Sequence, residues 1–257
     1  MEHKPERQLN ASECLQQIIA YYQPQIHIRT GALYGAEALA RWDSDGSGVR
    51  GPGDIFAVLE TYSERRALWK KMLGHTGVTF RRLKGVELNI AVNVCADIAA
   101  SVDWAEELSL FFNQHDLNPK NFTVEITESS SHNSELSLSE TVEQLRLRGF
   151  SCAIDDFGVG FSSLQRLATI AFSKLKIDKS FIHGARANVS GRKLIQHTVL
   201  LARDLGLTTI AEGIETEEDY DLARKLDVDI AQGFFIAKPM SSEKFISFVQ
   251  SYRTFFP

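Results

Sequence analysis

Short apolar runs of strand length recur along this chain, and each ends at a polar residue. The runs are rich in β-branched residues or are bounded by glycine and polar turns, which is typical of strands. Most are followed by helical periodicity, as in the spacing of Leu138, Val142 and Leu145. Strands that alternate with helices predict a mostly parallel sheet. The seven runs are LYGAEAL (33–39), VELNIAVN (86–93), FTVEIT (122–127), FSCAIDD (150–156), FSKLKID (172–178), TTIAEG (208–213) and DIAQG (229–233).

Helices are predicted between these runs and near the start of the chain. The apolar spacing predicts them over about 55–73, 103–115, 134–148, 191–205, 217–226 and 242–252. Gly149 and Gly206 fall where a helix-ending glycine belongs. Asn10 followed by Glu13 resembles a capping box and predicts a short helix that ends near Tyr22. We expect residues 1–9 to be a flexible leader and residues 10–257 to form one domain.

The segments 23–29 and 33–39 are predicted to pair as a β-hairpin through the turn Arg29-Thr30-Gly31. Too few residues separate the two segments for a parallel crossover, so the first strand should run antiparallel to the rest. The length of 257 residues fits the roughly 250 residues of a (β/α)8 barrel. The predicted fold class is therefore α/β, a modified TIM (β/α)8 barrel with one antiparallel strand.

Polar side chains at the ends of successive strands converge if the sheet closes into a barrel. In the apolar runs these residues are Glu37, Asn93, Glu125, Asp155, Lys176, Glu212 and Gln232. The adjacent acids Asp155 and Asp156 repel each other, and both stay ionised readily only beside a cation. Oxygen ligands with one neutral amide suit Mg²⁺ or Mn²⁺, whereas zinc normally recruits histidine or cysteine. The histidines His27, His115 and His183 are scattered, in a hairpin, a helix end and a loop, and we do not expect them to be ligands.

Composition narrows the class of protein further. The net charge is −5 with no long basic run, which argues against binding to a nucleic-acid polymer. The three cysteines form no CxxC pair, so a reducing cytoplasm fits best. No stretch approaches the ~18 apolar residues of a membrane span, although the chain could be cut from a longer membrane-tethered or sensor-linked protein. The glycine-rich string at 46–51 matches a dinucleotide-binding pattern only weakly, and we interpret it as a solvated loop.

Six motifs together closely resemble the EAL domain family, whose members are cyclic di-GMP phosphodiesterases. The motifs are EALARW (37–42), VEITES (124–129), IDDFGVGFSSL (154–164), LKIDKSFI (175–182), IAEGIET (210–216) and DIAQGFFIAKP (229–239). The resemblance runs from about Tyr22 to the C-terminal helix. It implies the barrel with one antiparallel strand, two divalent metals (Mg²⁺ or Mn²⁺), hydrolysis of cyclic di-GMP to linear pGpG in bacterial signalling, and a homodimer.

The resemblance also implies roles for individual residues. The metal ligands would be Glu37, Asn93, Glu125, Asp155, Asp156 and Glu212, and the water would be held by Lys176 and Gln232. Of these, the catalytic roles would fall to Glu37, Lys176, Glu212 and Gln232. Glu128 would fix the DDFG loop, and Glu215 would support the AEGIE turn. Substrate contacts would come from Gln23, Leu39, Arg41 and Pro239.

This chain departs from the family pattern at a few positions, none of which is a predicted ligand. Cys95 stands in place of a common serine, Val159 in place of threonine and Phe161 in place of tyrosine, and the segment DIFAVLETYS is reduced. Two other classes stay open from the sequence. One is a receptor that binds cyclic di-GMP without cleaving it, and the other is an unrelated metal-dependent barrel lyase or isomerase. Because Ca²⁺ prefers longer bonds than Mg²⁺, we expect Ca²⁺ to support binding but to inhibit turnover.

Overall fold

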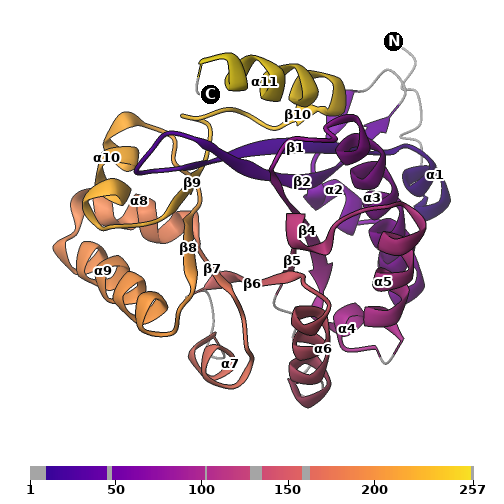
Figure 1. Cartoon of the computed structure of the whole chain (residues 1–257), viewed down its shortest axis with the longest axis horizontal. Coiled ribbons are helices and arrows are strands. Elements are labelled where there is room, and N and C mark those ends of the chain that lie inside the picture. Colours follow the sequence, from indigo (N-terminus) through magenta and orange to yellow (C-terminus); the bar gives the residue numbers. More distant parts are fainter. Residues whose placement is uncertain (1–9, 45–47, 102, 128–134, 158–162, 256–257) are drawn as a thin grey trace, which may run out of the picture.

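The computed structural model describes residues 10–44, 48–101, 103–127, 135–157 and 163–255, and it contains a closed eight-stranded barrel (Figure 1). β1 pairs with both β2 and β9 and so closes the sheet. Both of these pairings are antiparallel, whereas the ladders from β2 through β4 to β9 are parallel. The predicted fold, with its reversed first strand, is confirmed. The barrel strands are β1 Ile18–His27, β2 Leu33–Ser44, β4 Asn89–Cys95, β5 Phe122–Thr127, β6 Ser151–Phe157, β7 Lys174–Ile177, β8 Thr208–Ala211 and β9 Ile230–Gln232.

Two short strands extend the barrel at its edges. β3 (Gly48–Arg50) pairs antiparallel with the end of β2, and β10 (Met240–Ser241) pairs antiparallel with β1. Part of the glycine-rich string at 46–51, predicted as a loop, is therefore the edge strand β3. Residues 45–47 lie outside the described part of the chain.

Helices surround the barrel (Figure 1). In the described residues they are α1 Ala11–Gln16, α2 Pro52–Phe56, α3 Tyr62–Arg82, α4 Ala96–Ala99, α5 Trp104–Gln114, α6 Glu135–Leu147, α7 Ser163–Thr169, α8 Lys179–Ala187, α9 Val189–Asp204, α10 Glu217–Lys225 and α11 Ser242–Phe255, with a 3₁₀ turn at Pro119–Asn121. Gly149 and Gly206 follow α6 and α9 with φ of 93° and 71°, as predicted for helix-ending glycines. None of the described helices has both the length and the apolar character needed to cross a bilayer.

Three helix predictions were wrong. The first helix ends at Gln16 rather than near Tyr22, because the β-branched and aromatic run that follows pairs with β2 from Ile18 onward. The helix predicted at 55–73 is two helices, and α3 begins at a capping box in which Thr61 and Glu64 each accept from the other's backbone N–H. His183, predicted to lie in a loop, lies in α8, whose start Asp178 caps.

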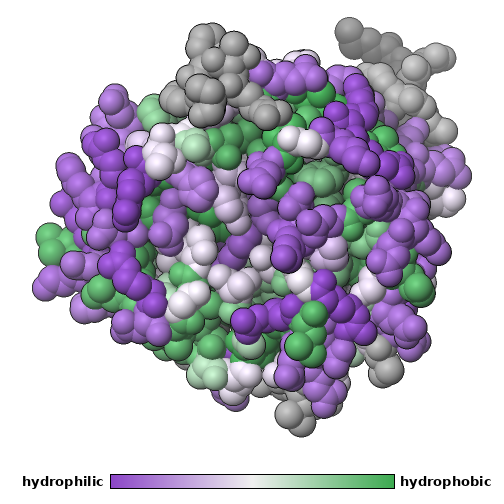
Figure 2. Space-filling view, in the orientation of Figure 1, coloured by the Kyte–Doolittle hydropathy of each residue, from purple (hydrophilic) through white to green (hydrophobic). Residues whose placement is uncertain are grey.

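The main core lies between the barrel and the helices. β5 shows how one strand serves both faces, because Phe122, Val124 and Ile126 are buried among apolar residues while Thr123 and Glu125 alternate with them. The Phe122 ring packs against the ring of Phe112 with centroids 4.6 Å apart. Hydrophilic side chains predominate on the molecular face in Figure 2, with small apolar patches between them. Within the barrel, the alternation seen in β5 leaves the inward positions of a strand available for polar groups.

Gly35 permits the close approach of β2 and β4. It pairs with Asn89, and a β-carbon added at residue 35 would overlap the backbone oxygen of Asn89. We expect Gly35→Ala to lower the free energy of unfolding by about 1–3 kcal/mol or more, because the ladder must shift to admit the methyl group. Urea unfolding checks this, with Gly53→Ala as control, since nothing lies within 4 Å of an added β-carbon there. Equal stability of the two variants would contradict the close-approach argument.

Candidate functional site

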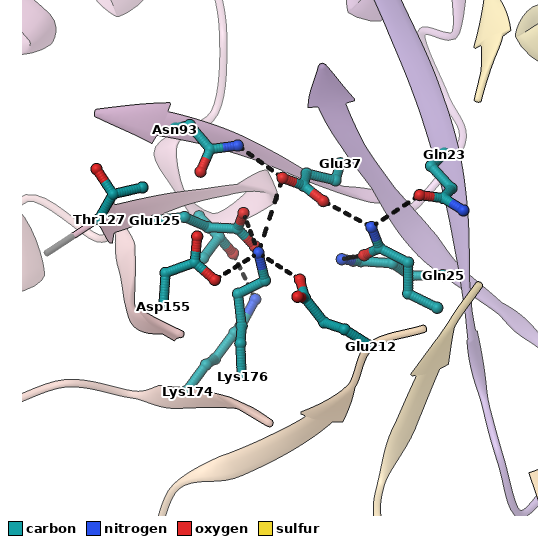
Figure 3. Close-up of polar contacts among 12 residues, drawn as sticks. Gln23, Gln25, Glu37, Asn93, Glu125, Thr127, Asp155, Lys174, Lys176 and Glu212 are labelled. Atoms are coloured by element: carbon teal, nitrogen blue, oxygen red, sulfur yellow. Dashed lines mark hydrogen bonds and ion pairs between the residues drawn. The ribbon is translucent and has the colours of Figure 1, made fainter. Parts of the chain in front are cut away.

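Side chains from seven strands or strand ends meet inside one end of the barrel (Figure 3). This is the end at which the parallel strands finish. Glu212 follows β8 directly, and the other members lie within their strands. The residues that converge are Glu37 (β2), Asn93 (β4), Glu125 (β5), Asp155 (β6), Lys176 (β7), Glu212 and Gln232 (β9).

The ammonium group of Lys176 lies at the centre of four carboxylates. Its Nζ is 2.7 Å from Glu212 Oε1, 2.8 Å from Glu125 Oε2, 2.9 Å from Asp155 Oδ1 and 3.7 Å from Glu37 Oε1. The Lys176 side chain is 1% exposed, so water screens these ion pairs weakly. The carboxylates, which repel one another, are held together by one shared cation.

Glu37 is held by two amide groups as well as by this ion pair. Asn93 Nδ2 donates to Glu37 Oε1, and Gln232 Nε2 donates to Glu37 Oε2, each at 2.6 Å. Gln232 Nε2 also donates to Gln23 Oε1 at 3.2 Å. Both donor hydrogens of Gln232 are therefore used, and a water molecule could reach this amide only at its oxygen.

Burial and the neighbouring charges shift the pKa values of these acids in different directions. Burial raises the pKa of Glu37, but Lys176 and the amide donors outweigh burial, and its pKa is lowered overall. Burial raises the pKa of Glu125 well above its ordinary value, and the pKa of Glu212 to about 7, despite the nearby Lys176. Four carboxylates against one ammonium leave a net formal charge of −3. A further cation would relieve this excess.

The donor set fits a hard divalent cation. It consists of carboxylate oxygens with the amide of Asn93, and Glu125 Oε1 is a buried oxygen without a hydrogen-bond partner in the described residues. The described acids and histidines do not, however, already surround an open point as metal ligands would. Lys176 occupies the centre instead, so an incoming cation must take over some of its carboxylate contacts.

Some predicted site residues lie outside the described part of the chain. They are Glu128 and the side chain of Asp156. Two of the departures from the family pattern, Val159 and Phe161, also lie outside it. Glu215 lies at the turn before α10, away from the carboxylate cluster. Its backbone N–H donates to Asp219, and its carboxylate lies 3.9 Å from Arg186, which also binds Asp219.

The predicted substrate residues lie at different places around the cluster. Gln23 joins it directly through Gln232, and Leu39 lines an adjoining pocket of about 460 Å³ with Glu37, Asn93 and Asp155. Arg41 is half-buried above Tyr21, with its guanidinium carbon 5.9 Å from the ring centre. Pro239 is half-buried and immediately precedes β10. No contact within the described residues joins Arg41 or Pro239 to the cluster by a hydrogen bond.

Two buried polar residues of the barrel interior were missed by the sequence analysis. Gln25 follows Gln23 by two residues and Lys174 precedes Lys176 by two, so each shares a strand face with a predicted site residue. Lys174 Nζ donates to Asn89 Oδ1 at 2.9 Å and to Thr123 Oγ1 at 2.5 Å. Strand alternation could have identified both residues, but attention to strand ends did not.

Comparisons with known proteins agree with this geometry. The EAL domain family matches residues 7–239. The chain is 35% identical over 231 residues to the cyclic di-GMP phosphodiesterase RocR of Pseudomonas aeruginosa, which covers 89% of this chain and 59% of that protein. It is 30% identical over 238 residues to the oxygen sensor protein DosP of Escherichia coli, covering 91% of this chain and 30% of that protein. The chain thus spans about three fifths of RocR and less than a third of DosP.

A solved structure of PaMucR phosphodiesterase in a c-di-GMP complex has a similar fold. The TM-score is 0.84 at 30% sequence identity, and the match covers 91% of this chain and 97% of that chain. The structure of the EAL enzyme Bd1971 in its cGMP-bound form matches with a TM-score of 0.85 at 26% identity, covering 93% of this chain and 67% of that one.

Lys174 makes stability depend on pH. Burial lowers its pKa from 10.5 to about 8, so between these values the unfolded chain binds more protons than the folded one. Stability must therefore rise as the pH increases from about 8 to 10.5, and the penalty for burying the charged form is fully present below pH 8. We expect the stability of the wild type to increase relative to Lys174→Met over this range, by at most about 3 kcal/mol.

Urea unfolding at pH 7.5 and pH 10 measures this difference. The exposed Lys193 provides the control, and Lys193→Met is measured in the same way for the loss of a lysine at the surface. A pH-independent difference for Lys174→Met would show that Lys174 is not a buried titrating amine.

Proposed function

Because the chain belongs to the EAL domain family, we propose that it is a metal-dependent phosphodiesterase that hydrolyses cyclic di-GMP to linear pGpG. The observation that carries the proposal is the convergence of Glu37, Glu125, Asp155 and Glu212 on Lys176 at the end of the barrel. RocR bears the name of a cyclic di-GMP phosphodiesterase, and the PaMucR phosphodiesterase structure is a c-di-GMP complex. A doubly anionic substrate requires positive charge at a site whose four acids and Lys176 have a formal charge of −3 when all are ionised.

Two divalent cations, Mg²⁺ or Mn²⁺, would supply that charge. The residues proposed to hold them are Glu37, Asn93, Glu125, Asp155, Asp156 and Glu212. When bound, such ions make a water molecule more acidic and offset negative charge on a phosphate. With cations held by these acids, Lys176 would share its carboxylate contacts with them, and its ammonium would be available to the phosphate.

Hydrolysis exchanges one bond to phosphorus. The water oxygen forms a new bond to phosphorus, the P–O3′ bond breaks, and the leaving O3′ gains a proton, which gives pGpG. Lys176 stabilises the negative charge that develops on the phosphoryl oxygens. Glu212, which lies 2.7 Å from Lys176, would accept the proton of the attacking water if its carboxylate is not fully engaged by metal.

Residues around the cluster would bind the rest of the dinucleotide. The guanidinium of Arg41 offers a planar set of donors for a phosphate. Gln23, Leu39 and Pro239 would contact the substrate beside it, and Leu39 lines the pocket of about 460 Å³. We further propose that the protein acts in the bacterial cytoplasm as a homodimer and lowers the level of this second messenger.

Glu37→Ala provides the first test of the function. We expect wild-type protein with Mg²⁺ or Mn²⁺ to convert cyclic di-GMP to pGpG, and Glu37→Ala to be at least about 100-fold slower, because the loss of a ligand exceeds the effect of outer-shell changes. Chromatography of the products measures both rates. The exposed Glu87 supplies the matched control, Glu87→Ala, which should retain wild-type activity.

The outcomes separate the classes of protein. Binding of cyclic di-GMP without any product would indicate a receptor rather than an enzyme. If the wild type neither binds cyclic di-GMP nor forms a product, the assignment of cyclic di-GMP as the ligand is rejected. Wild-type rates in a folded Glu37→Ala variant would remove Glu37 from the site.

Calcium should separate binding from turnover. Ca²⁺ can neutralise the carboxylates, but its ligand distances of about 2.3–2.6 Å exceed the roughly 2.0–2.1 Å of Mg²⁺. Longer bonds polarise the water less, so we expect cyclic di-GMP to bind in Ca²⁺ without being cleaved and to bind poorly after EDTA treatment. Calorimetry with product analysis checks this, and equally tight binding in EDTA would contradict the charge argument.

A further inference from the structure

Gln25 is a fully buried amide on the antiparallel strand β1, and none of the roles above includes it. It pairs directly with Gln232 across the β1–β9 ladder. Gln25 Nε2 donates to Gln232 Oε1 at 2.6 Å. Gln25 Oε1 is buried and has no hydrogen-bond partner in the described residues. Among those residues, the side chain of Gln25 therefore bonds to Gln232 through its nitrogen.

Gln25 is linked to Glu37 through Gln232, and each hydrogen bond of this chain is donated toward Glu37. A carboxylate can only accept, so Gln232 must turn its Nε2 toward Glu37 Oε2, as observed at 2.6 Å. The oxygen of the same amide then faces away from Glu37 and accepts from Gln25 (Figure 3). If Gln232 flipped, its oxygen would face the Glu37 carboxylate and its Nε2 would face the Nε2 of Gln25.

We propose that Gln25 is a positioning residue, which fixes the amide orientation of Gln232 and thereby keeps an N–H donor on Glu37. The need for it follows from the chemistry of the site. An amide oxygen is itself a ligand for hard cations, so an unrestrained Gln232 could turn its oxygen toward a bound cation and withdraw the donor from Glu37. Gln25 opposes that turn by occupying the oxygen.

This inference rests on the proposed function only for its catalytic consequence, and it can be tested without turnover. Gln25→Met keeps the length of the side chain and removes the donor. We expect it to weaken Mn²⁺ binding about 10-fold in calorimetry, at the lower end of outer-shell effects, and to lower kcat with little change in KM. Gln25→Glu should have a larger effect, because a carboxylate at this position attracts the Nε2 of Gln232 away from Glu37.

A double-mutant cycle with Gln232→Ala distinguishes positioning from general support of the core. If Gln25 acts through Gln232, Gln25→Met should cause no further loss of Mn²⁺ affinity when Gln232 is already alanine. In metal-free protein, ¹⁵N spectra should show that the side-chain amide signals of Gln232, assigned by their absence in Gln232→Ala, shift in Gln25→Met. Thr141→Val is the control for the loss of a buried polar group, since Thr141 bonds within its own helix, and should leave Mn²⁺ affinity unchanged.

Each outcome decides the proposal. Equal losses of affinity in both backgrounds, unshifted Gln232 signals, or wild-type Mn²⁺ affinity in Gln25→Met or in Gln232→Ala would overturn it. If Gln25→Glu does not fold, Gln25→Met alone carries the cycle. Absence of cyclic di-GMP hydrolysis in the wild type would reject the proposed function, whereas the Mn²⁺ cycle and the amide spectra would still report on Gln25.

Discussion

The site depends on one ammonium group that is shared by four carboxylates. Without a cation at its centre, the inward-facing acids of β2, β5, β6 and the end of β8 would repel one another in a poorly solvated space. Lys176 supplies that cation from the same barrel, and so allows the acids to remain together before any metal binds. Its own pKa is raised well above the ordinary value, because the carboxylates outweigh the effect of burial. The arrangement makes Lys176 both the counter-ion of the acids and a competitor of an incoming metal.

Neutral amides complete the arrangement without adding charge. Glu37 receives an N–H from Asn93 on one oxygen and from Gln232 on the other, so its carboxylate plane is fixed from two sides. The two glutamines of β1 then hold Gln232, with Gln23 accepting from its nitrogen and Gln25 donating to its oxygen. Gln23 in turn donates to the backbone oxygen of Ala237 at 3.1 Å, which ties these side chains to the loop after β9. The reversed strand therefore acts as a support for the acid that opens the EAL motif.

Much of the barrel could be predicted from sequence because strand-length apolar runs and glycine stops are local signals. The hairpin could be predicted from the length of its connection, since so few residues cannot make a parallel crossover. The break before α3 was missed because the apolar period continues across it, although the capping pair Thr61 and Glu64 marks the boundary. Strand alternation gives the face on which a residue lies but not its depth along the barrel axis. Alternation could have placed Gln25 and Lys174 on inward faces, but their layer and the central position of Lys176 depend on that depth, which the closed barrel shows.

The reversal of β1 also decides where the chain approaches the barrel. Ile18 pairs with Trp42 near the end of β2, and the residue before it, Gln17, binds both the Trp42 indole N–H and the Asp43 backbone N–H. In an all-parallel barrel the first strand would begin at the opposite end from the carboxyl ends of the strands. Here the first strand begins beside the mouth that holds the carboxylates. The polypeptide therefore reaches the rim of this mouth directly from α1, without first running along the barrel wall.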